Sequence, residues 1–168
     1  MDNLLSEIHH AYVGNENKIA LTIGNNRYSY EELIEKSLRV ARALESIGIT
    51  RNDKIATILP NGIEFVLLLL AAARLNVTIV PLPLGVTKSA LDTACKRVNV
   101  KHIICWHAIE SEFNDKGKQS LGVTIVGGSS SSTNHFDAFY NYSPLELNNS
   151  TTDIHSPYIL TMTSGSTG

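Results

Sequence analysis

Short apolar runs alternate with longer segments of helical periodicity through the middle of the chain, and this alternation limits the possible folds more than any other feature. Three runs are predicted strands, Ile55–Leu59, Val77–Leu82 and Lys101–Cys105, and the first is apolar enough to be covered on both faces of a sheet. Helical patterns separate them, first at Ile63–Leu75 and then after Thr87. This order is typical of parallel βαβ units with right-handed crossovers. The sequence therefore predicts an α/β fold with helices packed on a parallel sheet.

A hairpin and a long helix are predicted before this unit. Lys18–Ile23 has the composition of a strand, and a Gly-Asn-Asn turn separates it from a second strand that begins at Arg27. Ser29 followed three residues later by Glu32 is the pattern of a capping box. A helix of about five turns is expected to start there and to end near Gly48.

Polar residues mark the ends of the two later helices. Asn61 with Glu64 three residues on predicts an asparagine N-cap for the helix Ile63–Leu75. Asn76 suits the left-handed conformation that ends such a helix, and Thr87 is the predicted N-cap of the next one. The first dozen residues also have helical spacing of apolar side chains, whereas the polar stretch 141–153 is predicted to be irregular.

Composition excludes several classes of protein. The 168 residues are 43% hydrophobic and 18% charged with a net charge of −2, so we expect no nucleic-acid partner. The longest apolar run, Phe65–Ala73, is less than half of the roughly twenty residues that a membrane span needs, so no transmembrane segment is predicted. Cys95 and Cys105 lack metal-binding spacing, and no metal site is predicted. They are expected to be free, buried thiols in a reducing compartment, which favours a cytoplasmic protein, with peripheral contact to a lipid-bearing membrane left open.

The last stretch, Tyr158–Gly168, reads YILTMTSGSTG and joins a strand-like apolar run to a loop of glycine, serine and threonine. Glycines let the backbone approach a ligand, and hydroxyls can donate to phosphate oxygens or bind magnesium. The spacing differs from the Walker loop, so any phosphate grip is of another kind. A flexible polar linker is the other interpretation of this composition, and the strand before it argues against that. The predicted cofactor-binding residues are Thr163, Ser164, Gly165, Ser166, Thr167 and Gly168.

TSGSTG after a short apolar strand resembles the phosphate-loop signature of the adenylate-forming superfamily, which includes acyl- and aryl-CoA ligases, fatty acyl-AMP ligases, peptide-synthetase adenylation domains and luciferases. Two further blocks are similar to that superfamily in the right order, YSYEELIEKSLRVARALESIGITRNDKIATILPN and IEFVLLLLAAARLNVTIVPLPL. Asn76 stands where members usually have glycine, and both residues accept a positive φ.

The resemblance implies a two-step reaction that activates a carboxylic acid, such as a fatty or other acyl acid. ATP with Mg²⁺ first forms an acyl-adenylate, and a thiol of CoA or of a carrier-protein pantetheine then takes the acyl group. By the same resemblance, Thr163, Ser164, Ser166 and Thr167 would hold the β- and γ-phosphates, while Gly165 and Gly168 allow their approach.

The resemblance also implies that residues 1–168 are an N-terminal fragment of the large AMP-binding domain. Family members continue beyond the phosphate loop with the adenine, ribose and magnesium motifs and with a C-terminal domain that carries a catalytic lysine, so the stretch itself is expected to hold no catalytic residue and to be inactive alone. A short, non-catalytic binding or scaffold module derived from the same fold is the alternative hypothesis. An unrelated α/β domain with a serine-glycine linker is a third.

Overall fold

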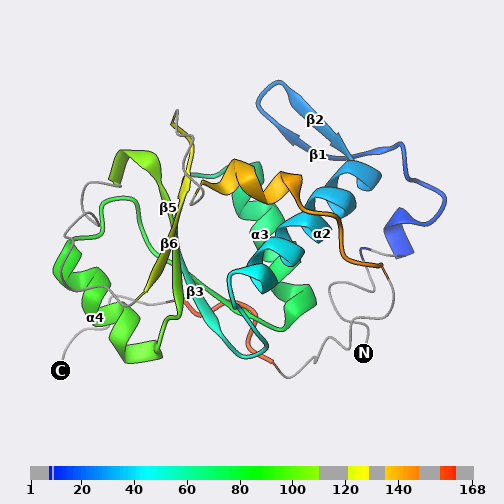
Figure 1. Cartoon of the computed structure of the whole chain (residues 1–168). Coiled ribbons are helices and arrows are strands. Elements are labelled where there is room, and N and C mark those ends of the chain that lie inside the picture. The colour runs from blue at the N-terminus through cyan, green and yellow to red at the C-terminus, as the bar shows by residue number, and fades with distance from the viewer. Residues whose placement is uncertain (1–7, 9, 110–120, 129–134, 148–155, 162–168) are drawn as a thin grey trace.

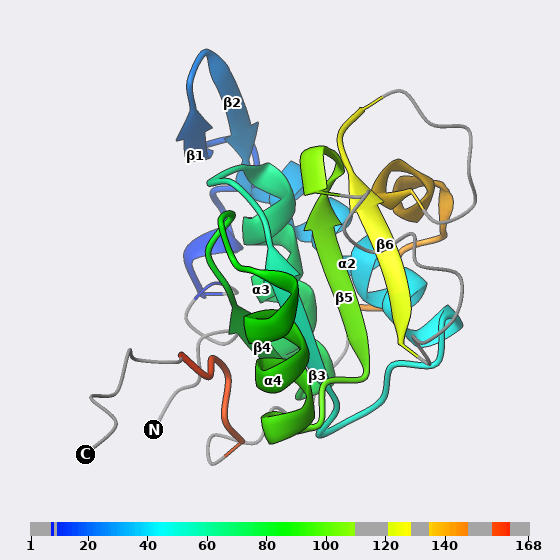
Figure 2. The same ribbon diagram turned by 90° about the vertical axis from the view of Figure 1, so that its left-hand side faces the viewer.

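A parallel sheet lies at the centre of the protein. The computed structural model describes residues 8, 10–109, 121–128, 135–147 and 156–161. The sheet has four strands in the order β4-β3-β5-β6, namely β3 (Lys54–Ile58), β4 (Thr78–Pro81), β5 (His102–Trp106) and β6 (Gly122–Val126). Helix α4 (Lys88–Val98) covers one face, and α2 (Tyr30–Ser46) and α3 (Ile63–Leu75) cover the other (Figures 1 and 2). The predicted α/β fold is confirmed.

The predicted hairpin and capping box are both present before the sheet. Strands β1 (Ile19–Ile23) and β2 (Asn26–Ser29) pair in antiparallel fashion. Ser29 then caps α2, since its Oγ accepts a hydrogen bond from the Glu32 amide at 3.1 Å and its own amide donates to the Glu32 carboxylate at 2.8 Å. This reciprocal pair satisfies two backbone donors that a helix start leaves free, which is why α2 begins where it does.

The prediction of an asparagine cap on α3 is wrong. Gly62 occupies the N-cap position in an extended conformation, and no side chain caps this helix. Asn61 therefore lies one residue outside the position from which a short side chain reaches the free amides of the first turn. The other end is as predicted, because Asn76 adopts the left-handed conformation with φ 53°. Thr87 caps α4, as expected, by accepting from the Ala90 amide at 3.3 Å.

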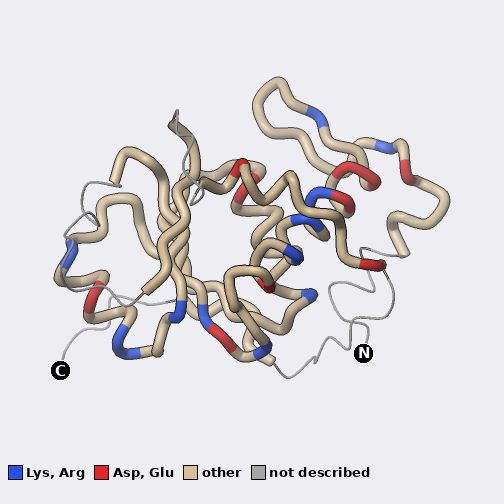
Figure 3. Tube along the Cα trace, in the orientation of Figure 1, with Lys and Arg blue, Asp and Glu red and all other residues tan. Residues whose placement is uncertain are grey.

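Charged residues lie along the helices and loops, and the two signs are interspersed over the described part of the chain (Figure 3). Arg39 pairs with Glu35 on α2, and Lys101 with Asp53 at the amino end of the sheet. Such exposed pairs contribute little to stability. None of the helices that the structure describes is long and apolar enough to cross a membrane.

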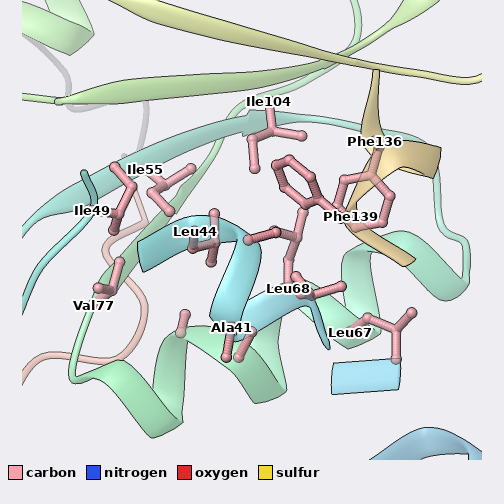
Figure 4. Packing of buried hydrophobic residues seen from close by; sticks show 14 of the residues in the cluster. Ala41, Leu44, Ile49, Ile55, Leu67, Leu68, Val77, Ile104, Phe136 and Phe139 are labelled. Atoms are coloured by element: carbon pink, nitrogen blue, oxygen red, sulfur yellow. The ribbon is translucent and has the colours of Figure 1, made fainter. Parts of the chain in front are cut away.

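Two hydrophobic clusters stabilise the sheet, one on each face. The larger one joins Leu44 of α2 and Leu68 of α3 to Ile55 and Ile104 of the sheet (Figure 4). The 3₁₀ helix η2 (Phe136–Asn141), which the sequence did not predict, adds two phenylalanine rings to this cluster. The smaller cluster packs α4 against the other face and contains the two cysteines, which are free and buried as predicted.

The chain returns from the sheet across the two helices through residues 136–147. Arg39 of α2 donates to the carbonyl oxygens of Tyr140 and Tyr142 at 3.3 and 2.7 Å. Arg74 of α3 donates to the Glu146 carbonyl at 2.6 Å. Residues 142–147 have no regular structure, in line with the sequence, and 148–153 lie outside the described residues. These charge-assisted bonds hold a segment whose own backbone forms no ladder.

A buried histidine lies at the amino end of the sheet. The Nε2 atom of His102 is 2.9 Å from Oγ1 of Thr124 on the neighbouring strand. Its ring lies against Gly122, where a side chain would collide with it. Burial lowers the pKa of His102 from its ordinary value of 6.5 to about 4. The ring is therefore neutral in the folded protein at physiological pH.

Truncation of the core residue Leu44 to alanine should lower the free energy of unfolding by about 2–5 kcal/mol, because it leaves a cavity between the two helices and the sheet. The matched control is Ile47→Ala at the end of the same helix, where the side chain is 39% exposed and the loss should stay below about 1 kcal/mol. Urea unfolding of both variants checks this. Equal losses would contradict the assignment of Leu44 to the core.

The folded state should also become less stable as the pH is lowered, because His102 is buried in its neutral form. Its pKa is lower in the folded than in the unfolded state, so the unfolded chain binds more protons as the pH drops from 6.5 towards 4. The folded state should lose on the order of 3 kcal/mol over that window. His102→Gln removes the titrating group and should flatten this part of the profile. A profile for His102→Gln that falls as steeply as that of the wild type would refute the prediction.

Candidate functional site

The carboxyl ends of the parallel strands meet at one edge of the sheet. The connections that follow them begin at Leu59 after β3, Leu82 after β4, His107 after β5 and Gly127 after β6. β4 lies on one side of β3 and β5 on the other, so the chain reverses its winding direction at β3. Open α/β sheets bind ligands outside the carboxyl ends of their strands. This edge is therefore where a site is expected.

The segment that precedes the predicted phosphate loop runs along the outer side of β4 (Figure 2). Ile159 forms a parallel bridge with Ile79. The Ile79 amide donates to the Tyr158 carbonyl at 3.0 Å, and the Leu160 amide donates to the Ile79 carbonyl at 2.9 Å. The predicted strand is thus present in the described residues as this one bridge, and it extends the sheet in the parallel sense.

Side-chain packing secures the same segment. Leu160 packs against the smaller hydrophobic cluster beside α4. Tyr158 is half-buried, and burial raises the pKa of its phenol to about 12, so the side chain is neutral at physiological pH. Ile159, between them, faces away and is 41% exposed. The alternation matches that of a strand with one covered side.

The predicted binding residues follow this segment directly. Thr161 is the last described residue of the segment, and it lies two residues beyond the bridge at Ile159, as Pro81 lies two residues beyond Ile79. Because the two stretches run parallel, both reach the carboxyl edge together. The predicted residues, which begin two positions after Thr161, lie outside the described residues: Thr163, Ser164, Gly165, Ser166, Thr167 and Gly168.

Two aromatic rings pack together at the other end of this edge, beyond β5 and beside the end of β6. The rings of Trp106 and His107 lie 4.7 Å apart between centroids. Gly127 has a φ of +76°, and a Cβ there would lie 2.6 Å from Cζ3 of Trp106. His135 bonds through Nε2 to the Gly127 carbonyl oxygen at 2.7 Å. The rings that pack against Gly127 come from the neighbouring strand β5 and the residue after it, so the local sequence around this glycine carries no signal for them.

No metal centre is built from the described residues, since they contain no group of three or more His, Cys, Asp or Glu side chains that could hold an ion. Within those ranges, the site-forming features are the carboxyl edge and the segment beside β4.

Replacement of Gly127 by alanine should displace Trp106, because the new Cβ would meet the indole ring and the backbone conformation disfavours a side chain. Trp106 is the single tryptophan of the 168 residues, so its emission spectrum reports on this contact alone. We expect a shifted emission maximum and a loss of about 1–3 kcal/mol in stability. Gly24→Ala is the matched control, since Gly24 also has a positive φ but nothing lies within 4 Å of its would-be Cβ. Unchanged emission in Gly127→Ala would contradict the packing described here.

Parts of the sequence are similar to those of known enzymes. A 2,3-dihydroxybenzoate-AMP ligase of Bacillus subtilis (strain 168) is 37% identical over 59 residues, which are 35% of this chain and 11% of that protein. An acyl-CoA synthetase of Alternaria alternata is 33% identical over 76 residues, 45% of this chain and 13% of that protein. The chain thus spans a small part of the length of these relatives.

Solved structures share the fold at low identity. The anthranilate CoA ligase in complex with anthranoyl-AMP superposes with a TM-score of 0.87 at 14% identity, over 99% of this chain and 33% of that one. The predicted fold, the N-terminal part of the adenylate-forming ligase fold, is confirmed by this likeness. Residues 8–168, nearly the whole chain, match the family described as AMP-binding enzyme. The chain belongs to the AMP-binding enzyme family.

Proposed function

We propose that the protein carrying this sequence is an AMP-forming acid–thiol ligase, and that residues 1–168 are the N-terminal part of its large AMP-binding domain. The observation that carries the proposal is the parallel placement of Tyr158–Leu160 beside β4, in the segment that directly precedes the residues resembling the family's phosphate loop. The family match over residues 8–168 supports it.

In the first step, a carboxylate oxygen of the acid attacks the α-phosphorus of ATP. An acyl–phosphate bond forms while the bond from the α-phosphorus to the bridging oxygen of the β-phosphate breaks, and pyrophosphate leaves with that electron pair. In the second step, a thiolate of CoA or of a carrier pantetheine attacks the acyl carbon, and AMP leaves. Both steps depend on positioning and on stabilising charge at phosphate oxygens.

Hydroxyl and amide donors of the loop would bind the β- and γ-phosphates of ATP. We assign this role to the residues predicted from the sequence, namely Thr163, Ser164, Gly165, Ser166, Thr167 and Gly168. Mg²⁺ would neutralise phosphate charge, and it would be held chiefly by the phosphates, as is usual for this ion.

The acid is proposed to be a fatty or other acyl acid. An acyl-CoA synthetase and an aryl acid–AMP ligase are both among the similar proteins, so the shared chemistry is activation of a carboxylate. The fragment by itself is expected to be inactive. A cytoplasmic location is proposed because neither Cys95 nor Cys105 is in a disulfide, as expected in a reducing compartment.

Acid-dependent exchange of labelled pyrophosphate into ATP tests this function. The protein carrying this sequence should show exchange with members of a panel of straight-chain fatty acids and aryl acids. Ser164→Ala should lower the exchange rate roughly tenfold to a hundredfold, because a hydrogen bond to a charged group contributes about 1.5–3 kcal/mol.

The control is Thr22→Ala, which removes an exposed hydroxyl from β1 and should leave the exchange rate unchanged. Wild-type protein that exchanges pyrophosphate with none of the acids would exclude the ligase function. Full exchange in Ser164→Ala would exclude the assigned role of that serine.

A further inference from the structure

The outer edge of β4 has few backbone amides available to donate to a further strand. The Thr78 amide points inwards, towards the residue before β3, and donates to the Asp53 carbonyl at 2.9 Å. On the outer edge a parallel ladder would use the amides of every second residue, which here are Val77, Ile79 and Pro81. The Val77 amide already donates to the Ala72 carbonyl at 2.9 Å, and proline has no N–H. Among the amides of β4 on this edge, that of Ile79 is therefore the one left to donate to the incoming segment.

A side chain supplements this short ladder. The Thr78 hydroxyl donates to the Pro157 carbonyl at 2.7 Å. Thr78 is 3% exposed, so water does not compete effectively for this bond. Together with the two bonds of Ile79, it gives the segment three hydrogen bonds to β4, at Pro157, Tyr158 and Leu160.

We propose that Thr78 is a positioning residue for the phosphate-binding loop. This inference rests on the proposed function, since the loop begins six residues after Pro157 at Thr163. Without the hydroxyl, the backbone bonds of the segment to β4 that the structure describes are the two made by Ile79. A shift by one residue would also exchange the covered Leu160 for the exposed Ile159. The hydroxyl thus holds Pro157, at the start of the segment that leads into the loop.

Thr57 provides a matched control on the neighbouring strand. Thr57 is 1% exposed, and its hydroxyl has no hydrogen-bond partner in the part of the chain that the structure describes. Thr57→Val and Thr78→Val therefore make the same substitution in adjacent buried strands, but only the second removes a hydrogen bond. Thr78→Ser retains the donor and is the rescue variant.

Hydrogen–deuterium exchange without nucleotide measures the tether directly. In Thr78→Val, the amides of Ile79 and Leu160 should exchange about fivefold faster, the effect of one ordinary hydrogen bond. Thr78→Ser and Thr57→Val should exchange like the wild type. Unchanged exchange in Thr78→Val would overturn the proposal.

Steady-state pyrophosphate exchange separates positioning from mere stability. In Thr78→Val, the KM for ATP should rise about fivefold while the KM for the acid stays constant, and Thr78→Ser should restore it. A lower Tm with both KM values unchanged would show that the bond only stabilises the fold, which would overturn the positioning role. If the wild type shows no acid-dependent exchange, the proposed function and this role fall together, while amide exchange still decides whether the tether exists.

Discussion

The whole structure depends on covering both faces of one parallel sheet. A parallel strand buried on both sides needs helices above and below, and the crossovers supply them: α3 follows β3 on one face and α4 follows β4 on the other. Burial of these apolar surfaces is the main favourable term in folding. Because the two helices lie on opposite faces, β4 and β5 must lie on opposite sides of β3.

That strand order leaves β4 as the outermost strand, so its outer side is open to pairing with a further segment. The chain returns from β6 across α2 and α3, where arginine side chains hold its carbonyl groups, and it reaches the outer side of β4. Because Pro81 has no N–H and the Val77 amide is bonded to Ala72, the Ile79 amide is the donor on this edge that bonds the segment at Tyr158.

Much of the fold could be predicted from local patterns. The apolar runs, the Ser29–Glu32 box and the left-handed Asn76 each follow from interactions within a few residues, and each is confirmed. The prediction of an asparagine cap on α3 was wrong because Asn61 and Gly62 are both candidates for the N-cap position, and the local sequence does not decide between them. Helix η2 was missed because its two phenylalanines gain their stability from α2 and α3, far away in the sequence.

The sequence alone determined the order of elements, the family resemblance and the predicted phosphate-binding residues, because these depend on residue types at short spacing. The tertiary structure decided which strands are neighbours, that Tyr158–Leu160 lies beside β4, and that the Thr78 hydroxyl meets Pro157. Those contacts join residues about eighty positions apart. No local propensity encodes such a pairing, since it arises when packing brings distant segments to the same edge.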